Sequence, residues 1–138
     1  MSEEMKIALL FLYAYLVGSI PMAYLFGRIL KGIDLREYGS GNVGTSNAWV
    51  HVAKWVILPV GLFDTVVKGS SPLWIARYTL RLGPEAQAAA GLLAMAGHNW
   101  SPYMGFRGGR GVGPAAGVLF GLYPPRFPLE MFAFTVVG

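Results

Sequence analysis

Long uncharged stretches dominate the pattern of hydrophobic and polar positions along this chain. Residues 7–27 contain no charged side chain. At about 1.5 Å of rise per residue, a helix of this length covers roughly the 30 Å hydrocarbon thickness of a bilayer. A signal peptide would instead have an apolar region of about 7–15 residues behind a basic start. Because the longer stretch follows Glu3 and Glu4, the pattern favours a retained membrane-spanning helix.

Two further apolar stretches have the length of a membrane span. The second stretch covers residues 52–80. The third begins at residues 83–85, GPE, where Pro84 suits a first helical turn and Glu85 suits the positive end of the helix dipole. It continues to about residue 106. We therefore expect two more spanning helices here.

A fourth apolar stretch begins near Val112 and is broken at residues 124–128, PPRFP. The apolar segment at residues 129–138 is too short to span a bilayer alone. It is expected either to be re-entrant or to belong to a truncated chain. The pattern thus predicts an all-α fold, a polytopic integral membrane helical bundle with about four to five membrane segments. We take residues 1–138 as a single transmembrane domain, incomplete or shortened.

Proline and small residues predict local irregularity in the first two stretches. Pro21 removes one backbone hydrogen bond, which Ser19 or a neighbouring helix could compensate, so a kink is expected. A second kink is expected at residues 69–72, GSSP. The first stretch also carries small residues that allow close helix packing, namely Gly18, Ser19, Ala23 and Gly27.

Composition agrees with a membrane protein and excludes several other classes. Hydrophobic residues make up 54% of the chain and charged residues 13%, whereas an ordinary soluble domain carries about 25% charge. A soluble globular or disordered chain is therefore excluded. The absence of cysteine removes disulfide scaffolds, cysteine-ligated zinc and thiol catalysis. The net charge of +4 comes from scattered single residues, so no nucleic-acid partner is expected.

The basic residues predict the orientation, because cytoplasmic loops carry an excess of Lys and Arg. The first and third loops hold six of them, Arg28, Lys31, Arg36, Lys54, Arg107 and Arg110. The N-terminus and the second loop hold three, Lys6, Arg77 and Arg81. The first and third loops are therefore expected to face the cytoplasm, with the N-terminus outside.

The first loop contains a glycine-rich segment at residues 39–47, GSGNVGTSN. Glycines let backbone N–H groups converge and let a ligand approach closely, and Ser and Asn add neutral donors. If Ser46 or Asn47 caps the following helix, its positive end adds to the same place. The segment suits an anion, although a flexible polar turn is an equal alternative.

The third loop contains a second such segment at residues 105–113, GFRGGRGVG. Arg presents a planar fork that matches phosphate oxygens, and glycines clear space around it. The spacing is not that of a Walker loop. An interfacial turn that only satisfies the orientation rule is the alternative. Two anion-suited loops on one side of a membrane nevertheless indicate one or two phosphate-bearing ligands.

Three ionisable residues lie within the apolar stretches, where such groups are costly and usually have a partner. Asp64 and Lys68 are spaced i, i+4 and share a helix face. They are expected to form an ion pair, or Lys68 extends towards the phosphate site. His98 lies late in the third stretch and either contacts a neighbouring helix or acts on a substrate hydroxyl.

Five ordered motifs, running from about residue 7 to residue 122, resemble those of the bacterial acyl-phosphate:glycerol-3-phosphate acyltransferases. They are GSIP at 18–21, GSGNVGTSN at 39–47, Asp64, Lys68 and Gly69 as D-x-x-x-K-G, Gly97-His98, and FRGGRGV at 106–112. Arg107 and Arg110 stand where the family usually has lysines. The family's enzymes also continue into a third cytoplasmic motif that this chain does not contain, which implies a fragment or a shortened homologue.

The resemblance implies transfer of a fatty acyl group from acyl-phosphate to the 1-hydroxyl of glycerol 3-phosphate, giving lysophosphatidic acid. It implies that acyl-phosphate is bound by Ser40, Gly41, Asn42, Gly44, Thr45 and Asn47, and glycerol 3-phosphate by Lys68, Arg107, Gly108, Gly109 and Arg110. Ser40, Asn42 and His98 would be the catalytic residues, with no metal and no cofactor. The partners would be both substrates, membrane lipid and an upstream enzyme that makes acyl-phosphate, at the bacterial inner membrane.

Two other classes of function fit parts of the sequence. A small transporter of phosphate-bearing solutes would also use broken helices and charged residues at membrane depth. Transport needs anion-suited residues on both faces, and the outer loop around residues 80–83 offers few. A catalytically inactive homologue that binds lipid is the other alternative.

Overall fold

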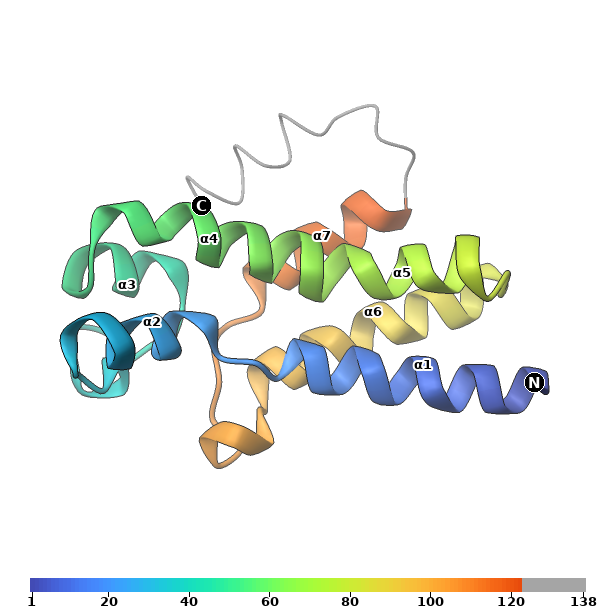
Figure 1. Cartoon of the computed structure of the whole chain (residues 1–138), viewed down its shortest axis with the longest axis horizontal. Coiled ribbons are helices and arrows are strands. Elements are labelled where there is room, and N and C mark those ends of the chain that lie inside the picture. Colours follow the sequence, from blue (N-terminus) through green and yellow to red (C-terminus); the bar gives the residue numbers. More distant parts are fainter. Residues whose placement is uncertain (123–138) are drawn as a thin grey trace.

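The computed structural model describes residues 1–122, and residues 123–138 lie outside the described part (Figure 1). The predicted break at residues 124–128 and the apolar segment after it therefore lie outside the described residues. Within residues 1–122 the regular elements are all helical, which agrees with the predicted class. They are α1 (Glu3–Gly18), α2 (Met22–Lys31), η1 (Leu35–Glu37), α3 (Thr45–His51), η2 (Lys54–Val56), α4 (Ile57–Leu62), η3 (Phe63–Ser70), α5 (Ser71–Trp74), η4 (Ile75–Thr79), α6 (Pro84–Asn99), η5 (Pro102–Met104) and α7 (Val112–Leu122).

Within residues 1–122, two stretches are long and apolar enough to cross a membrane, Glu3–Lys31 and Lys54–Thr79. They correspond to the first two predicted spans. The helix α6 has 16 residues, which is short of the roughly 20 that a perpendicular span needs, and α7 has 11 residues within the described part of the chain. The number of membrane segments therefore stays a prediction.

The first long stretch is broken between α1 and α2, at the predicted proline. Pro21 has no N–H to continue the helix. The Ser19 hydroxyl donates to the Tyr15 carbonyl at 2.6 Å, and the Ser19 carbonyl accepts a hydrogen bond from the Ser101 hydroxyl at 2.5 Å. The expected kink is thus a break, and part of the lost backbone bonding is replaced by a segment far along the chain.

The second long stretch stays helical through Pro72, but its backbone hydrogen-bonding pattern changes between α-helical and π-helical turns. The segment η3 is a π-helix, a form that is frequent at functional sites. Near Pro72, the Ser71 hydroxyl donates to the Val67 carbonyl, and the Ser70 hydroxyl donates to the Gly117 carbonyl of α7 at 2.7 Å. Residues 69–72 thus lie where the π-helix η3 passes into α5, and the kink expected there stays a prediction.

The helix α6 begins where the sequence predicts it, with Gly83 as N-cap and Pro84 in the first turn. It ends at Asn99, so the prediction that this span continues to about residue 106 was wrong. A residue that precedes proline is disfavoured in the α conformation, and Ser101 precedes Pro102. The chain turns there and places the second glycine-rich loop over the end of α6.

Glycines allow the closest helix contacts. A Cβ atom at Gly18 of α1 would overlap the backbone of Ala94 in α6, so the predicted close packing of the first span is confirmed at this position. A Cβ atom at Gly117 of α7 would overlap the Thr65 carbonyl and the Gly69 Cα atom of η3. This second crossing was not predicted, and it holds η3 against the helix that follows the second loop.

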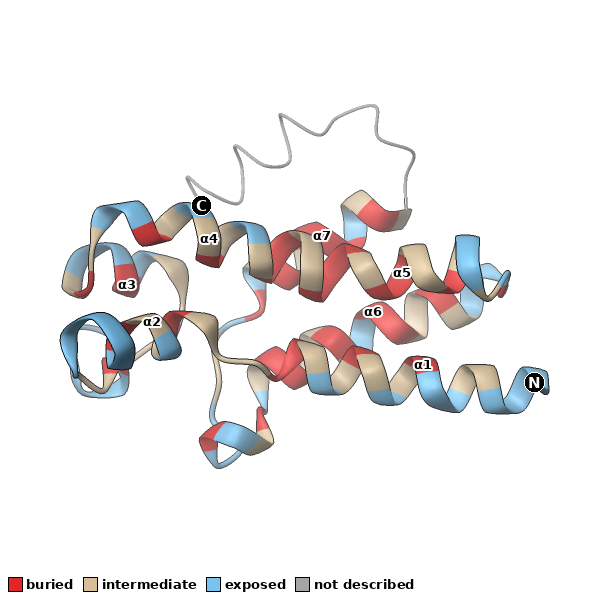
Figure 2. Ribbon diagram, in the orientation of Figure 1, coloured by how far each residue is buried: buried red, intermediate tan, exposed pale blue. Residues whose placement is uncertain are grey.

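Among the residues that the structure describes, two hydrophobic clusters lie at opposite ends. One joins α1, η4 and α6 near the N-terminus, and the other joins α2, α3, η2 and α4. Figure 1 shows the N-terminus and the turn before α6 at one end and α2 and α3 at the other. Buried positions follow the facing sides of α5, α6 and α7, whereas α1 exposes its outer side (Figure 2).

Candidate functional site

The first glycine-rich loop is held in shape by left-handed glycines and local hydrogen bonds. Gly39 and Gly41 have φ angles of 54° and 74°, which a residue with a Cβ atom rarely adopts. The Gly41 N–H donates to the Tyr38 carbonyl at 2.8 Å, and the Asn42 N–H donates to the Ser40 hydroxyl at 3.2 Å. Ser40 is exposed, and its hydroxyl accepts a hydrogen bond from within its own loop.

Asn47 ties this loop to the helix that follows. Its buried side-chain amide lies within hydrogen-bond distance of the carbonyls of Leu35, Tyr38 and Asn42, at 3.2, 2.9 and 2.9 Å. The N-cap of α3 is Gly44, so the expectation that Ser46 or Asn47 caps this helix was wrong. The physical reason is that the Asn47 amide is committed to the loop carbonyls and α3 already begins at Thr45.

Asp34 and Arg36 form an ion pair in the segment that precedes this loop. Asp34 caps η1 by accepting from the Arg36 N–H, and its carboxylate also accepts from the Arg36 guanidinium at 2.7 Å. The hydrogen bonds from Arg36 hold the pKa of Asp34 below its usual value. Arg36 is therefore paired within the protein, although the sequence count placed it among the basic residues of the first loop.

The second glycine-rich loop folds back over the C-terminal end of α6. The Gly108 N–H donates to the Asn99 carbonyl at 2.8 Å, and the Gly109 N–H donates to the His98 carbonyl at 3.1 Å. These N–H groups therefore satisfy helix carbonyls, and they are not turned towards a ligand as expected from the sequence. A Cβ atom at Gly108 would overlap the His98 carbonyl, which explains why this crossing requires glycine.

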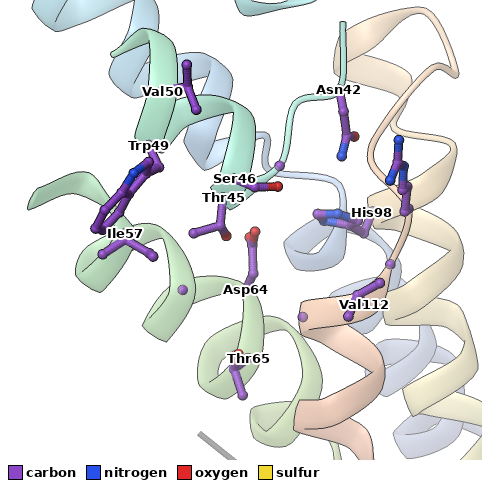
Figure 3. A pocket seen from close by; sticks show the side chains of 15 residues that line it. Asn42, Thr45, Ser46, Trp49, Val50, Ile57, Asp64, Thr65, His98 and Val112 are labelled. Carbon is purple, nitrogen blue, oxygen red and sulfur yellow. The ribbon is translucent and has the colours of Figure 1, made fainter. Parts of the chain in front are cut away.

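A cavity of about 490 Å³ lies where the two loops meet η3 and the end of α6. Figure 3 shows Asn42, Thr45, Asp64 and His98 around the same space. The full lining is Asn42, Gly44, Thr45, Ser46, Trp49, Val50, Ile57, Gly61, Asp64, Thr65, His98, Arg110, Gly111, Val112 and Gly113. Segments that are far apart in sequence thus share one hollow.

The cavity is polar in one part of its lining and apolar in another. Amide, hydroxyl, imidazole and guanidinium groups come from Asn42, Thr45, His98 and Arg110. Apolar lining comes from α3 and α4, through Trp49, Val50, Ile57 and Gly61. Such a hollow suits a ligand that has an anionic head and a hydrocarbon part.

Three buried ionisable residues lie in contact beside the cavity. Lys68 Nζ lies 2.9 Å from Asp64 Oδ1 and 2.9 Å from His98 Nδ1. Asp64 and His98 line the cavity, whereas Lys68 lies behind them with 1% of its surface exposed. Lys68 neutralises a carboxylate that would otherwise repel an anion in the cavity. The expected ion pair of Asp64 and Lys68 is present.

The structure separates the predicted site residues into two groups. Those that line the cavity are Asn42, Gly44, Thr45, His98 and Arg110. Those outside its lining are Ser40, Gly41, Asn47, Lys68, Arg107, Gly108 and Gly109. Arg107 is exposed, and most of the others hold the loops in shape. Within residues 1–122, no group of three or more His, Cys, Asp or Glu side chains is placed to hold a metal ion.

Sequence reasoning missed part of the cavity wall. Asp64 was expected as the ion-pair partner of Lys68 and as part of the D-x-x-x-K-G motif, but it was not named as a site residue, although it lines the cavity. Thr65 and Gly61 also line the cavity, and nothing in their local sequence distinguishes them from other residues of an apolar helix. Their position depends on how η3 and α4 pack against the loops.

The comparisons with known proteins agree with one another. Residues 8–138 match the family described as glycerol-3-phosphate acyltransferase. The glycerol-3-phosphate acyltransferase of Gloeobacter violaceus is 44% identical over 116 residues, covering 81% of this chain and 56% of that protein. That of Azotobacter vinelandii is 43% identical over 133 residues, covering 92% of this chain and 69% of that protein. The chain spans about half the length of most of the curated relatives it matches.

Solved structures show the same arrangement of helices. The crystal structure of PlsY (YgiH), an integral membrane glycerol 3-phosphate acyltransferase, in its glycerol 3-phosphate form superposes with a TM-score of 0.81 at 34% identity. The match covers 94% of this chain and 62% of that one. The lysophosphatidic acid form gives a TM-score of 0.78 at 32% identity, covering 94% and 61% of the two chains.

Proposed function

This chain belongs to the glycerol-3-phosphate acyltransferase family, and on that premise we propose that it transfers a fatty acyl group from acyl-phosphate to the 1-hydroxyl of glycerol 3-phosphate. The product would be lysophosphatidic acid. The observation that carries the proposal is the single cavity formed by both glycine-rich loops, with polar groups in one part and apolar walls in another. An acyl-phosphate has the same two-part character.

The first loop is proposed to bind the acyl-phosphate. Asn42 and Thr45 supply neutral donors to its phosphate, and Gly44 allows close approach of the backbone. Ser40, Gly41 and Asn47 keep the loop in the required shape, which is supported by the hydrogen bonds that they make within it. The acyl tail would lie along Trp49, Val50, Ile57 and Gly61.

The second loop is proposed to bind glycerol 3-phosphate. Arg110 reaches the cavity from this loop and offers a charged fork to the phosphate. Gly108 and Gly109 hold Arg110 in place by capping α6, and the exposed Arg107 attracts the anion at the rim. Lys68 contributes through its contact with His98 rather than by touching the phosphate.

The reaction needs no enzyme nucleophile, because an acyl-phosphate is already an activated mixed anhydride. The glycerol hydroxyl oxygen forms a bond to the acyl carbon, and the bond between that carbon and the phosphate oxygen breaks. The hydroxyl proton passes to a phosphate oxygen, and inorganic phosphate leaves. The proposed residues screen the repulsion between two anions, bring the hydroxyl within reach and stabilise developing negative charge.

A membrane location is supported by the two long apolar helices and by the integral membrane relative. We further propose a multi-pass protein of the bacterial inner membrane with both glycine-rich loops facing the cytoplasm. The excess of basic residues around those loops supports this orientation. A cytoplasmic site would also receive acyl-phosphate directly from the upstream enzyme that makes it.

The test is an assay of acyl transfer to radiolabelled glycerol 3-phosphate by the membrane-inserted chain. Acyl-phosphate, acyl-CoA and acyl carrier protein are offered separately as donors, and lipid product is measured. We expect product from acyl-phosphate alone. Product from acyl-CoA alone would reject the donor assignment, and the absence of product from every donor would reject the proposed activity.

Two arginines of one loop provide a matched comparison of roles. Arg110→Ala removes a charged hydrogen-bond donor from the cavity and is expected to lower kcat/KM for glycerol 3-phosphate by about 100-fold. Both arginines are exposed, but Arg107 does not line the cavity, so Arg107→Ala is expected to lower kcat/KM by less than about tenfold. Equal losses in both variants would show that net loop charge, and not placement in the cavity, determines binding.

A further inference from the structure

The contact between Lys68 and His98 has a consequence for the imidazole. Lys68 Nζ lies 2.9 Å from His98 Nδ1, and both side chains are buried. Asp64 Oδ1 lies 2.9 Å from the same ammonium group. An ammonium group has donors and no acceptor, so the ring nitrogen that faces it must accept a hydrogen bond.

The charge state of Lys68 follows from its other neighbour. A neutral amine could accept a hydrogen bond from an Nδ1–H group, but Asp64 would then be a buried carboxylate without a compensating cation, or would itself hold the proton that Lys68 had lost. The short contact between Asp64 and Lys68 therefore favours the charged pair. An imidazolium ring would place an N–H donor and a second positive charge against the ammonium, and the geometry disfavours it as well.

We infer that the row Asp64–Lys68–His98 fixes His98 as the neutral tautomer with its proton on Nε2, so that His98 presents an N–H donor to the cavity. The inference rests on the proposed function for the identity of the acceptor, which is a phosphate or carbonyl oxygen of the substrates. His98 then stabilises negative charge and does not remove the hydroxyl proton. Lys68 and Asp64 are positioning residues that act through the ring.

The second loop explains how the Nε2 edge of the ring is left accessible. A Cβ atom at Gly109 would overlap His98 Nε2, so the loop must pass this nitrogen without a side chain. Among the described residues, the one side-chain hydrogen bond of His98 is that to Lys68. The Nε2 donor is therefore free for a ligand in the cavity that His98 lines.

The first test reads the tautomer directly and does not require activity. The chain has two histidines, so His51→Gln leaves His98 as the one imidazole for ¹⁵N NMR of histidine-labelled, membrane-inserted protein. We expect a protonated Nε2 and an unprotonated Nδ1 that shows the shift of a hydrogen-bond acceptor. Lys68→Met should abolish that shift, and Lys54→Met, at an exposed position of the same long helical stretch, should not. A protonated Nδ1 in the unaltered site would overturn the inference.

The second test separates a donor from a base by activity. A glutamine side chain at this position would place an amide N–H near the position of Nε2 but could not act as a base, so His98→Gln is compared with His98→Leu. We expect His98→Leu to lower kcat by about 100-fold or more, as for loss of one oxyanion donor, and His98→Gln to retain most of it. Equal, complete losses would overturn the donor role. If neither the native chain nor the variants transfer acyl groups, the proposed function fails while the NMR result still decides the tautomer.

Discussion

Two asparagines five residues apart have different surroundings in the first loop. Asn47 is buried, and its amide lies against three backbone carbonyls. Asn42 is half-buried and lines the cavity. The same residue type therefore holds the loop in one position and faces the ligand space in the other.

This difference predicts opposite outcomes for the two alanine variants. Asn47→Ala leaves carbonyls without a donor and should lower the free energy of unfolding by about 1–3 kcal/mol. Asn42→Ala should change it by less than about 0.5 kcal/mol, as for a position without a structural role, but should abolish acyl transfer. Thermal unfolding in detergent and the radiolabelled assay would measure both. A destabilised Asn42→Ala with normal Asn47→Ala would reverse the assignment.

The residue types of the site could be predicted from sequence, but their contacts could not. Glycine, asparagine and arginine in the two loops indicated an anion site, and the cavity includes Asn42 and Arg110. The hydrogen bonds of Gly108 and Gly109 to the end of α6 could not be predicted, because they depend on where α6 stops. The role of Lys68 behind the cavity wall likewise depends on the distance between η3 and α6.

At the scale of elements, glycines determine how closely the helices approach. The crossing of α7 and η3 brings Gly117 against the Thr65 carbonyl and Gly69. Thr65 lines the cavity and Gly69 follows Lys68, so the crossing positions two parts of the site. Hydropathy predicted both helices from their length and apolarity, but a glycine in an apolar run gives no indication of which helix it will meet.

The close contact between α7 and η3 predicts that one methyl group added at Gly117 will destabilise the protein. Gly117→Ala would overlap backbone atoms that cannot move aside and should destabilise the protein by about 1–3 kcal/mol. Gly61→Ala is the control, because nothing lies within 4 Å of its Cβ position and alanine favours a helix by about 0.5–1 kcal/mol over glycine. Thermal unfolding of both variants is the measurement. Equal stabilities would show that α7 can shift away from η3.

The position of Gly61 predicts that a larger side chain on α4 would limit the length of the acyl chain. Gly61 lines the apolar part of the cavity and faces open space, so Gly61→Phe should fill that space without disturbing neighbours. At about 0.8 kcal/mol per buried CH₂ group, displacing two or three methylenes weakens binding by roughly 2 kcal/mol. The preferred donor should therefore shift to shorter acyl-phosphates.

The measurement is kcat/KM for acyl-phosphates of increasing chain length. Leu58→Phe is the control, because Leu58 lies on the same helix, is 54% exposed and does not line the cavity. An equal loss for every chain length would place the acyl tail elsewhere.

At the scale of the whole molecule, contacts between distant segments assemble the site. The Ser101 hydroxyl bonds the Ser19 carbonyl at the break after α1, and α6 packs along α1 through Gly18. These contacts set where α6 ends and hence where the second loop begins. Charge counting predicted that both loops share one side, but it could not predict that they enclose one cavity with α3 and η3.

The two glycine-rich loops lie at one end of the molecule and the start of α6 lies towards the other (Figure 1), which predicts the side of the membrane that each faces. The chain has no cysteine, so single cysteines report position without background labelling. Glu37 and Tyr103 are exposed beside the two loops, and Glu85 is exposed at the start of α6, towards the opposite end (Figure 1). In sealed vesicles, an impermeant maleimide should label Glu37→Cys and Tyr103→Cys from one side and Glu85→Cys from the other. Labelling of the two loop positions from opposite sides would separate the loops across the bilayer and remove the basis for a shared cavity.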